Sequence, residues 1–135
     1  KPRDAPQAPT RKHLILVDTS LWVDHLRRGR SDLATLLEDN LVLSHPWVIG
    51  ELALGRVSNR TEILGLLQGL PQATVATSAE LLALIDSQGL SGLGIGYVDT
   101  QLLAATLLTP DTKLWSADKR LGAAAVRLGC AANAS

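Results

Sequence analysis

Aromatic residues and methionine are scarce in this sequence of 135 residues, which has no Phe, no Met and one Tyr. The core must therefore consist mainly of Leu, Val, Ile and Ala, with Trp22, Trp47 and Trp115 as its large fillers. The single cysteine, Cys130, excludes an internal disulfide and a metal site built from several thiolates. No apolar run approaches the roughly 20 residues that a membrane-spanning helix needs, and no stretch resembles a signal peptide. We therefore expect a soluble, cytoplasmic protein that does not bind a membrane.

The chain also has no net charge, because its acidic and basic residues are equal in number, but these residues are unevenly distributed. Residues 1–12 carry four basic side chains and one acidic side chain, so the rest of the chain has a net charge of −3. Nucleic-acid-binding proteins are usually basic, so this balance argues against such a partner unless a bound cation and local basic patches reverse the potential. Residues 1–12 also hold three prolines, and we expect a disordered tail or an expression remnant there, followed by one domain over residues 13–135.

Short apolar segments alternate with helical patterns along the chain. Residues 14–17 form an unbroken apolar run that ends at a carboxylate, as expected of a strand buried on both faces. Strands are predicted over residues 14–17, 41–44, 73–76 and 113–116, and helices over residues 20–27, 31–39, 46–55, 61–67, 78–88, 97–108 and 118–128. This alternation predicts an α/β protein with a parallel sheet of four or five strands flanked by helices, in which a fifth strand at residues 129–131 is only weakly indicated.

Four acidic residues stand out because the predicted fold places them where ligands bind. Asp18 follows the first strand directly, and the ligands of open α/β sheets collect at the carboxyl ends of the strands. Asp118 follows the last predicted strand by two residues and begins a helix. Glu51 and Asp99 each share a helix face with apolar residues, so both are predicted to point inward, where a lone charge is costly.

Each of these acids has an ordinary explanation when it is taken alone. Asp18 and Asp118 can cap helices, and Asp99 can favour a helix dipole, whereas an inward Glu51 needs a partner. The remaining acids of the domain fall near caps, turns or exposed faces, and we assign them to solubility and capping. If the four acids converge, their mutual repulsion calls for a cation, and oxygen ligands suit Mg²⁺ or Mn²⁺. Such a centre activates water for attack on a phosphodiester, so it favours hydrolysis of nucleic acid.

Four fragments that contain these acids follow one another in an informative order. They are Leu16-Val17-Asp18-Thr19-Ser20, Gly50-Glu51-Leu52, the segment from Gly96 to Ala105 and the segment from Leu114 to Leu121. Together they resemble the PIN-domain ribonucleases, specifically the VapC-type toxins of bacterial toxin–antitoxin pairs, and the similarity spans residues 14–128. The resemblance implies a PIN-like three-layer α/β/α fold and a Mg²⁺- or Mn²⁺-dependent endoribonuclease that acts as a toxin.

The resemblance also implies roles for individual residues. The positions that match the family's catalytic acids are Asp18, Glu51, Asp99 and Asp118. Asp18 and Asp99 would bind the metal directly, and the other two acids would hold water or a second ion. Ser20 and Ser116 match hydroxyl positions that support the acids by hydrogen bonding, whereas Ala117 departs from the polar or basic residue that relatives often have there. The implied partners are an RNA substrate, a cognate antitoxin and a second copy of the chain in a homodimer.

Lys119 and Arg120 follow Asp118 directly and are the basic residues best placed to meet the backbone of an RNA substrate. Two other functions remain open at this point. One is a PIN-like module that binds RNA or a partner protein with little catalysis, and the other is a PIN nuclease that acts on DNA or in RNA maturation. The presence of all four acids favours an enzyme, because a binding module does not need them all.

Overall fold

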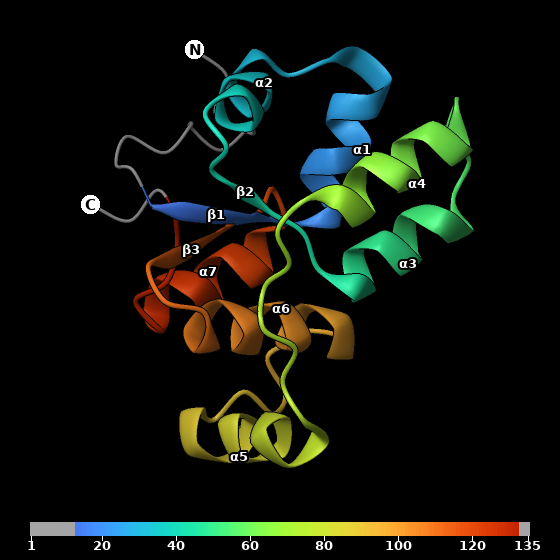
Figure 1. Cartoon of the computed structure of the whole chain (residues 1–135). Coiled ribbons are helices and arrows are strands. Elements are labelled where there is room, and N and C mark those ends of the chain that lie inside the picture. The colour runs from blue at the N-terminus through green and yellow to red at the C-terminus, as the bar shows by residue number, and fades with distance from the viewer. Residues whose placement is uncertain (1–12, 133–135) are drawn as a thin grey trace.

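The computed structural model of the chain describes residues 13–132, which form three strands and seven helices (Figure 1). The tail predicted over residues 1–12 lies outside the described residues. The strands form one parallel sheet in which β1 (Leu14–Val17) lies between β2 (Val42–Leu43) and β3 (Thr112–Trp115). The most apolar strand therefore occupies the centre of the sheet, where both of its faces are covered.

The register of the sheet determines which residues meet at its carboxyl edge. Val17, the last residue of β1, pairs with Trp115, the last residue of β3. Because these strands are parallel, the residues that follow them, Asp18 and Ser116, emerge side by side at the same edge. The pairing of two strands far apart in the sequence thus brings an acid and a hydroxyl together.

The sheet has fewer strands than the four or five predicted. At each expected outer position, the chain touches the sheet at one isolated parallel bridge. The bridges pair Gln72 with Ser44 and Ala131 with Leu114. The segment predicted as a strand over residues 73–76 leaves the sheet after Ala73, because the next amide, Thr74 N, donates to Thr109 Oγ1 at 2.9 Å. The backbone N–H of Thr74 is therefore bonded to the side chain of Thr109, at the end of a helix, and not to a neighbouring strand.

All seven predicted helices are present, and their ends lie within about two residues of the predicted positions, the usual uncertainty of helix boundaries. They are α1 (Thr19–Arg28), α2 (Ser31–Glu38), α3 (Pro46–Leu54), α4 (Arg60–Gly69), α5 (Ser78–Gln88), α6 (Tyr97–Leu108) and α7 (Lys119–Arg127). Across the described residues, no helix is both long and apolar enough to span a membrane.

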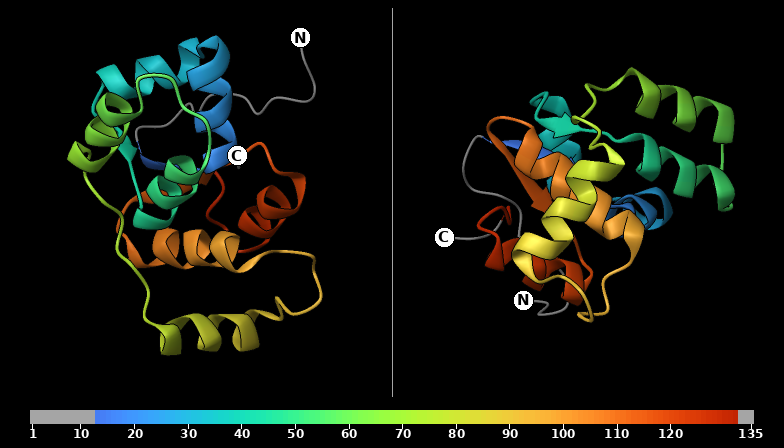
Figure 2. Two further views of the ribbon diagram at one scale, coloured as in Figure 1. Left: turned by 90° about the vertical axis from the view of Figure 1, so that its right-hand side faces the viewer. Right: turned by 90° about the horizontal axis from the view of Figure 1, so that it is seen from below.

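The helices cover both faces of the sheet, which confirms the predicted α/β arrangement. Helices α1 and α2 lie on one side of the sheet and α6 lies on the other (Figure 1). Helix α5 packs against the outer side of α6, away from the sheet, and begins with a capping box between Thr77 and Glu80 (Figure 2). Helices α3 and α4 pack against each other beside α1. The four acids predicted from the sequence accordingly lie at the starts of α1, α6 and α7 and in the later part of α3.

Helix α3 begins at a buried imidazole. Pro46 occupies the first turn, where a missing N–H group has no cost, and His45 precedes it. His45 Nδ1 accepts a hydrogen bond from Trp47 N at 3.0 Å, so the ring caps the helix. Burial lowers the pKa of His45, which keeps the ring neutral and able to accept this bond. The cap fixes the start of the helix that carries Glu51.

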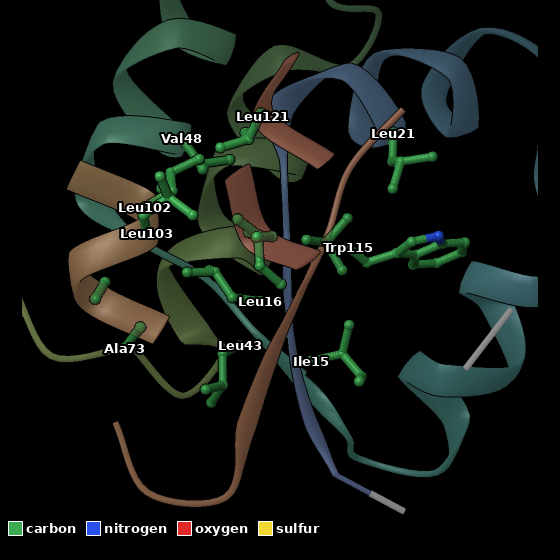
Figure 3. Packing of buried hydrophobic residues seen from close by; sticks show 14 of the residues in the cluster. Ile15, Leu16, Leu21, Leu43, Val48, Ala73, Leu102, Leu103, Trp115 and Leu121 are labelled. Carbon is green, nitrogen blue, oxygen red and sulfur yellow. The ribbon is translucent and has the colours of Figure 1, made fainter. Parts of the chain in front are cut away.

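The core surrounds β1 on both faces. Leu16 lies on the side of Leu102 and Leu103 of α6, while Ile15 points to the opposite side (Figure 3). Among the three tryptophans predicted to be core fillers, Trp22 and Trp115 are buried. The prediction is wrong for Trp47, whose exposed fraction is 39%. Helix α3 is apolar on more than one face, so the hydrophobic pattern alone did not separate its buried side from its exposed side.

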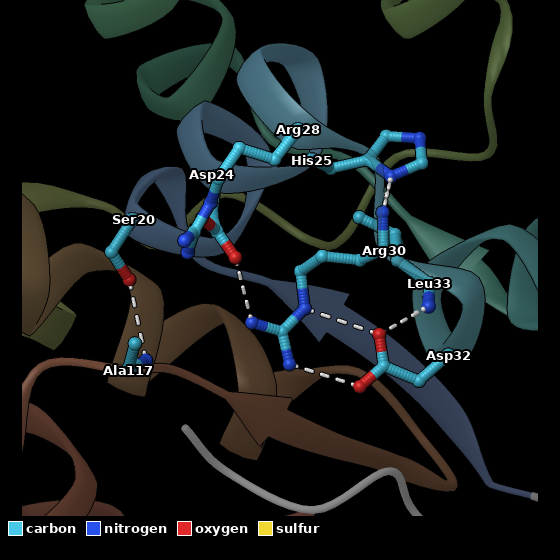
Figure 4. Close-up of polar contacts among 8 residues, drawn as sticks. All are labelled: Ser20, Asp24, His25, Arg28, Arg30, Asp32, Leu33 and Ala117. Atoms are coloured by element: carbon cyan, nitrogen blue, oxygen red, sulfur yellow. Dashed lines mark hydrogen bonds and ion pairs between the residues drawn. The ribbon is translucent and has the colours of Figure 1, made fainter. Parts of the chain in front are cut away.

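A polar cluster joins α1 to the start of α2 (Figure 4). The side chain of Arg30 is only 12% exposed and donates to Asp24 Oδ2 at 2.9 Å and to both carboxylate oxygens of Asp32. Its guanidinium carbon lies 5.3 Å from the centroid of the Trp115 ring, within the range of a cation–π contact. The two aspartates therefore hold a largely buried cation, a role beyond the solubility and capping assigned from the sequence. Asp32 does lie in the first turn of α2, where its Oδ1 accepts a hydrogen bond from Leu33 N.

Candidate active site

Asp18 is the most buried of the four acids, with an exposed fraction of 5%. Ser20 Oγ and Ser116 Oγ donate to the same carboxylate oxygen, Asp18 Oδ2, at 2.8 and 2.7 Å. A buried carboxylate needs such donors, and two of them on one oxygen hold the side chain in a single orientation. Asp18 occupies the N-cap position of α1, but its side chain makes no capping hydrogen bond. Helix capping therefore does not explain this acid.

Asp118 is connected to Asp18 through the same serine. Its backbone N–H donates to Ser116 Oγ at 2.9 Å, so this hydroxyl both donates to one acid and accepts from the other. Asp118 Oδ1 accepts from Leu121 N at 2.9 Å and caps α7, as the sequence allowed. Ala117 N donates to Ser20 Oγ at 3.2 Å, which ties this loop to α1 (Figure 4). The turn between β3 and α7 is thus fixed against the start of α1.

Glu51 reaches the site from α3. Its Oε1 accepts a hydrogen bond from Thr19 Oγ1 at 2.7 Å, which joins α3 to the first residue of α1. Glu51 is exposed, so the prediction that it points into the core is wrong. Among the apolar residues three or four positions from Glu51, Trp47 and Leu54 are exposed as well, whereas Val48 is buried. Thr19 was not assigned a role from the sequence, although a hydroxyl directly after a strand-end acid was the available signal.

Asp99 lies in the first turn of α6 and is half-buried. Burial raises the pKa of Asp99 from its ordinary value of 3.8 to about 6, and the negative charges of Asp18, Asp118 and Glu51 add to the effect. Repulsion of this kind requires the carboxylates to lie near one another. The structure therefore gathers the four predicted acids from four separate segments at the carboxyl edge of the sheet.

The charge of this site is not balanced by the protein. In the segment from 13 to 132, no basic side chain forms an ion pair with any of the four acids. Within that same segment, no three His, Cys, Asp or Glu side chains are gathered closely enough to form a metal-ligand set by themselves. The donors are carboxylate and hydroxyl oxygens, which suit a hard cation that keeps several water ligands.

Lys119 and Arg120, predicted to contact the RNA backbone, begin α7 beside the acids and are both exposed. The guanidinium of Arg120 lies against the loop that precedes α6, since a Cβ atom on Gly94 would be 2.6 Å from Arg120 Nη1. Gly94 also has a φ of +76°, so both its conformation and its surroundings favour glycine. Arg120 therefore buttresses the loop leading to Asp99, and contact of either residue with RNA stays a prediction.

Comparison with known proteins gives the family of the chain. No protein-family model matches the sequence. Among curated proteins, the chain is 45% identical over 118 residues to Ribonuclease VapC32 of Mycobacterium tuberculosis, in strains CDC 1551 / Oshkosh and ATCC 25618 / H37Rv. The alignment covers 87% of this chain and 95% of each relative. Identity at this level along nearly the full length of the relatives means that the chain belongs to the VapC-type ribonucleases, a PIN-domain family.

Proposed function

We propose that this protein is a metal-dependent endoribonuclease that cleaves RNA phosphodiesters and acts as the toxin of a toxin–antitoxin pair. The observation that carries the proposal is the convergence of the four acids: Ser116 Oγ joins Asp18 to Asp118, Thr19 joins the start of α1 to Glu51, and the charges of these acids act on Asp99. Negative charges gathered without a cation destabilise the folded protein, and a bound cation offsets their repulsion. The relatives carry the name ribonuclease. Cleavage of RNA at this site accounts both for that name and for the gathered acids.

Mg²⁺ or Mn²⁺ is the cofactor that the donor chemistry supports. Asp18 and Asp99 would hold the ion directly, and Glu51 and Asp118 would orient its water ligands, since Mg²⁺ usually takes one or two protein carboxylates and keeps several waters. When bound, such an ion supplies positive charge to the scissile phosphate and activates water for attack.

The residues around the acids contribute orientation. Ser20 and Ser116 fix one oxygen of Asp18, so its carboxylate is already oriented before any ligand arrives. Thr19, which directly follows Asp18 in the chain, orients the carboxylate of Glu51 by donating a hydrogen bond to it. At neutral pH, Asp99 is mostly ionised despite its elevated pKa of about 6, so the site presents its negative charge where a cofactor ion has to bind.

The test is cleavage of RNA in the presence of Mg²⁺ or Mn²⁺, with and without EDTA. Asp18→Asn and Asp99→Asn should each lower the cleavage rate by roughly 100-fold or more, because each removes a proposed ligand of the ion. Asp86→Asn, the same chemical change on the exposed surface of α5, is the matched control and should cleave like the wild type. Equal cleavage by all four proteins, or cleavage that persists in EDTA, would overturn the proposal. A DNA strand of the same sequence tests the alternative that the substrate is DNA.

The toxin role requires a protein that holds the enzyme inactive. A cognate antitoxin is the partner that we propose, with a basic side chain entering the acidic site to neutralise its charge. We also propose a homodimer in the cytoplasm. A small DNA-binding protein encoded next to this chain should abolish RNA cleavage when it is added in equal amount, and light scattering should give twice the chain mass for the free enzyme. An adjacent protein without effect on cleavage would contradict the antitoxin assignment.

A further inference from the structure

The aromatic side chains of this protein are divided between two places. The chain contains three tryptophans and one tyrosine, and Trp22 and Trp115 are buried in the core. Trp47 and Tyr97 are instead 39% and 49% exposed. Their rings touch in an edge-on arrangement, with centroids 5.8 Å apart and planes 69° from parallel. Half of a small set of aromatic residues therefore lies together on the surface, in an arrangement that the core does not require.

This aromatic pair (Trp47 and Tyr97) stands at the edge of the acidic site. Trp47 lies one helical turn before Glu51 on α3, and Tyr97 lies two residues before Asp99 at the start of α6. A groove of about 480 Å³ lies beside Trp47, within the size range of small-molecule binding sites. It is lined by Pro46, Trp47, Gly50, Glu51, Leu54 and Val98, the residue next to Tyr97. Because Glu51 belongs to both the groove and the acid cluster, the groove adjoins the proposed catalytic acids.

The groove is open and apolar. A Cβ atom on Gly50 would meet no atom within 4 Å, so its floor is unfilled. Leu54, another residue of the lining, is 92% exposed. The only charged residue in the lining is Glu51, which repels phosphate. A flat and uncharged group therefore fits the groove better than a phosphate does.

Glu51 also lines a second groove, which has a different character. This groove has a volume of about 400 Å³, and its lining includes Arg27 of α1 and Arg56, which follows α3. Two guanidinium groups suit the phosphates of a nucleic-acid strand. An extended strand that occupies both grooves would thus contact Trp47 in one and positive charge in the other.

We propose that Trp47 and Tyr97 form a platform for one unpaired nucleobase beside the scissile phosphate, with the neighbouring backbone phosphate held near Arg27 and Arg56. Since the two ring planes are 69° apart, the base stacks on the face of one ring and the other ring holds that ring in place. This inference rests on the proposed ribonuclease function and names the residues that contact a base of the substrate. Aromatic side chains bind unstacked bases through their faces, with little dependence on base identity, and a base in a duplex is not accessible to them. The platform therefore requires an unpaired base next to the cleaved bond.

The first experiment measures steady-state cleavage of a short single-stranded RNA by Trp47→Leu, Tyr97→Leu and Trp47→Phe. Leucine keeps apolar bulk but removes the aromatic face, so each leucine variant should raise KM about tenfold while kcat changes by less than about twofold. Trp47→Phe retains a face and should recover most of the loss. Leu82→Ala, which truncates an exposed leucine on α5, is the control and should behave like the wild type.

The second experiment removes the base rather than the aromatic ring. Each position flanking the cut is replaced in turn by an abasic nucleotide, and the effect of Trp47→Leu on KM should disappear at one of these positions only. Binding is followed separately in an Asp18→Asn background, which does not cleave, through quenching of tryptophan fluorescence by the oligonucleotide. Because the other two tryptophans are buried, quenching should depend on Trp47.

The outcomes distinguish failure of the platform from failure of the proposed function. If the Trp47→Leu effect persists at every abasic position, or if quenching survives in Trp47→Leu, the platform is refuted. If the leucine variants change the mass seen by light scattering but leave RNA binding unchanged, this face joins two copies of the chain and the platform is again refuted. If the wild-type protein cleaves no RNA, the proposed function fails, and the binding titration still decides whether the aromatic pair holds a base.

Discussion

Replacement of Asp99 by asparagine should stabilise the protein while it destroys the site. In the absence of a cation, Asp99 carries its charge against the repulsion of three other carboxylates and in a partly buried position. Asparagine has nearly the same shape and no charge, so it removes the repulsion without leaving a cavity. A residue that serves function at the expense of stability should behave in this way.

The magnitude follows from the elevated pKa. Each pH unit between the folded and unfolded pKa values is worth about 1.4 kcal/mol, so a rise from 3.8 to about 6 corresponds to roughly 3 kcal/mol for a fully buried group. Asp99 is only half-buried, and solvent screening reduces this figure to about 1–2 kcal/mol. Because the folded state binds the proton more tightly, the wild type is relatively more stable below pH 4 and loses that advantage as the pH rises through 6. The full difference between the variant and the wild type should therefore be present at pH 7 and vanish near pH 4.

Urea unfolding at several pH values between 4 and 8, in EDTA, measures this difference directly. The variant should be about 1–2 kcal/mol more stable than the wild type at pH 7, and added Mg²⁺ should stabilise the wild type but not the variant. Asp86→Asn is again the control, since it makes the same change on an exposed face of α5. An Asp99→Asn protein that is less stable than the wild type at pH 7, or a difference that does not vary with pH, would refute the reasoning.

Three further changes test other parts of the structure. Ser116→Ala removes one of the two donors to Asp18 and should raise the Mg²⁺ concentration needed for half-maximal cleavage roughly 10- to 100-fold, and an unchanged metal titration would contradict this supporting role. Arg30→Ala should lower the urea midpoint of unfolding more than Arg28→Ala does, because the Arg30 side chain is 12% exposed and that of Arg28 is 78% exposed. Thr77→Ala should cost about 1 kcal/mol through loss of the capping box, with cleavage unchanged because α5 lies outside α6, whereas a loss of activity would show that α5 supports the site.

Much of the site could be predicted from the sequence because strand ends are local signals. The apolar run before Asp18 marks a central strand, and a parallel sheet brings the ends of its strands to one edge. The segment before Asp118 has the same form at lower strength. Neither inference needs a distant contact, and the structure brings both acids to the predicted edge.

The predictions from the sequence were wrong where tertiary contacts determine the structure. Helix α3 has apolar residues on all sides, and only its packing beside α1 and α4 determines that Trp47 and Leu54 face outward with Glu51. The expected strand over residues 73–76 fails because Thr109, a side chain 35 residues from Thr74, takes its backbone donor. Burial of a helix face and pairing of an edge strand depend on neighbours that the local sequence does not contain.

The hydrogen bond between Ser116 and Asp18 spans 98 residues of sequence and joins the first strand to the last. In a chain made from its N-terminus, the segment with Asp18 is synthesised well before β3 and the acid that follows it. Until β3 pairs with β1, one edge of the central strand is unfilled and Ser116 and Asp118 are missing from the site. The four acids therefore come together only after the last strand of the described residues has joined the sheet.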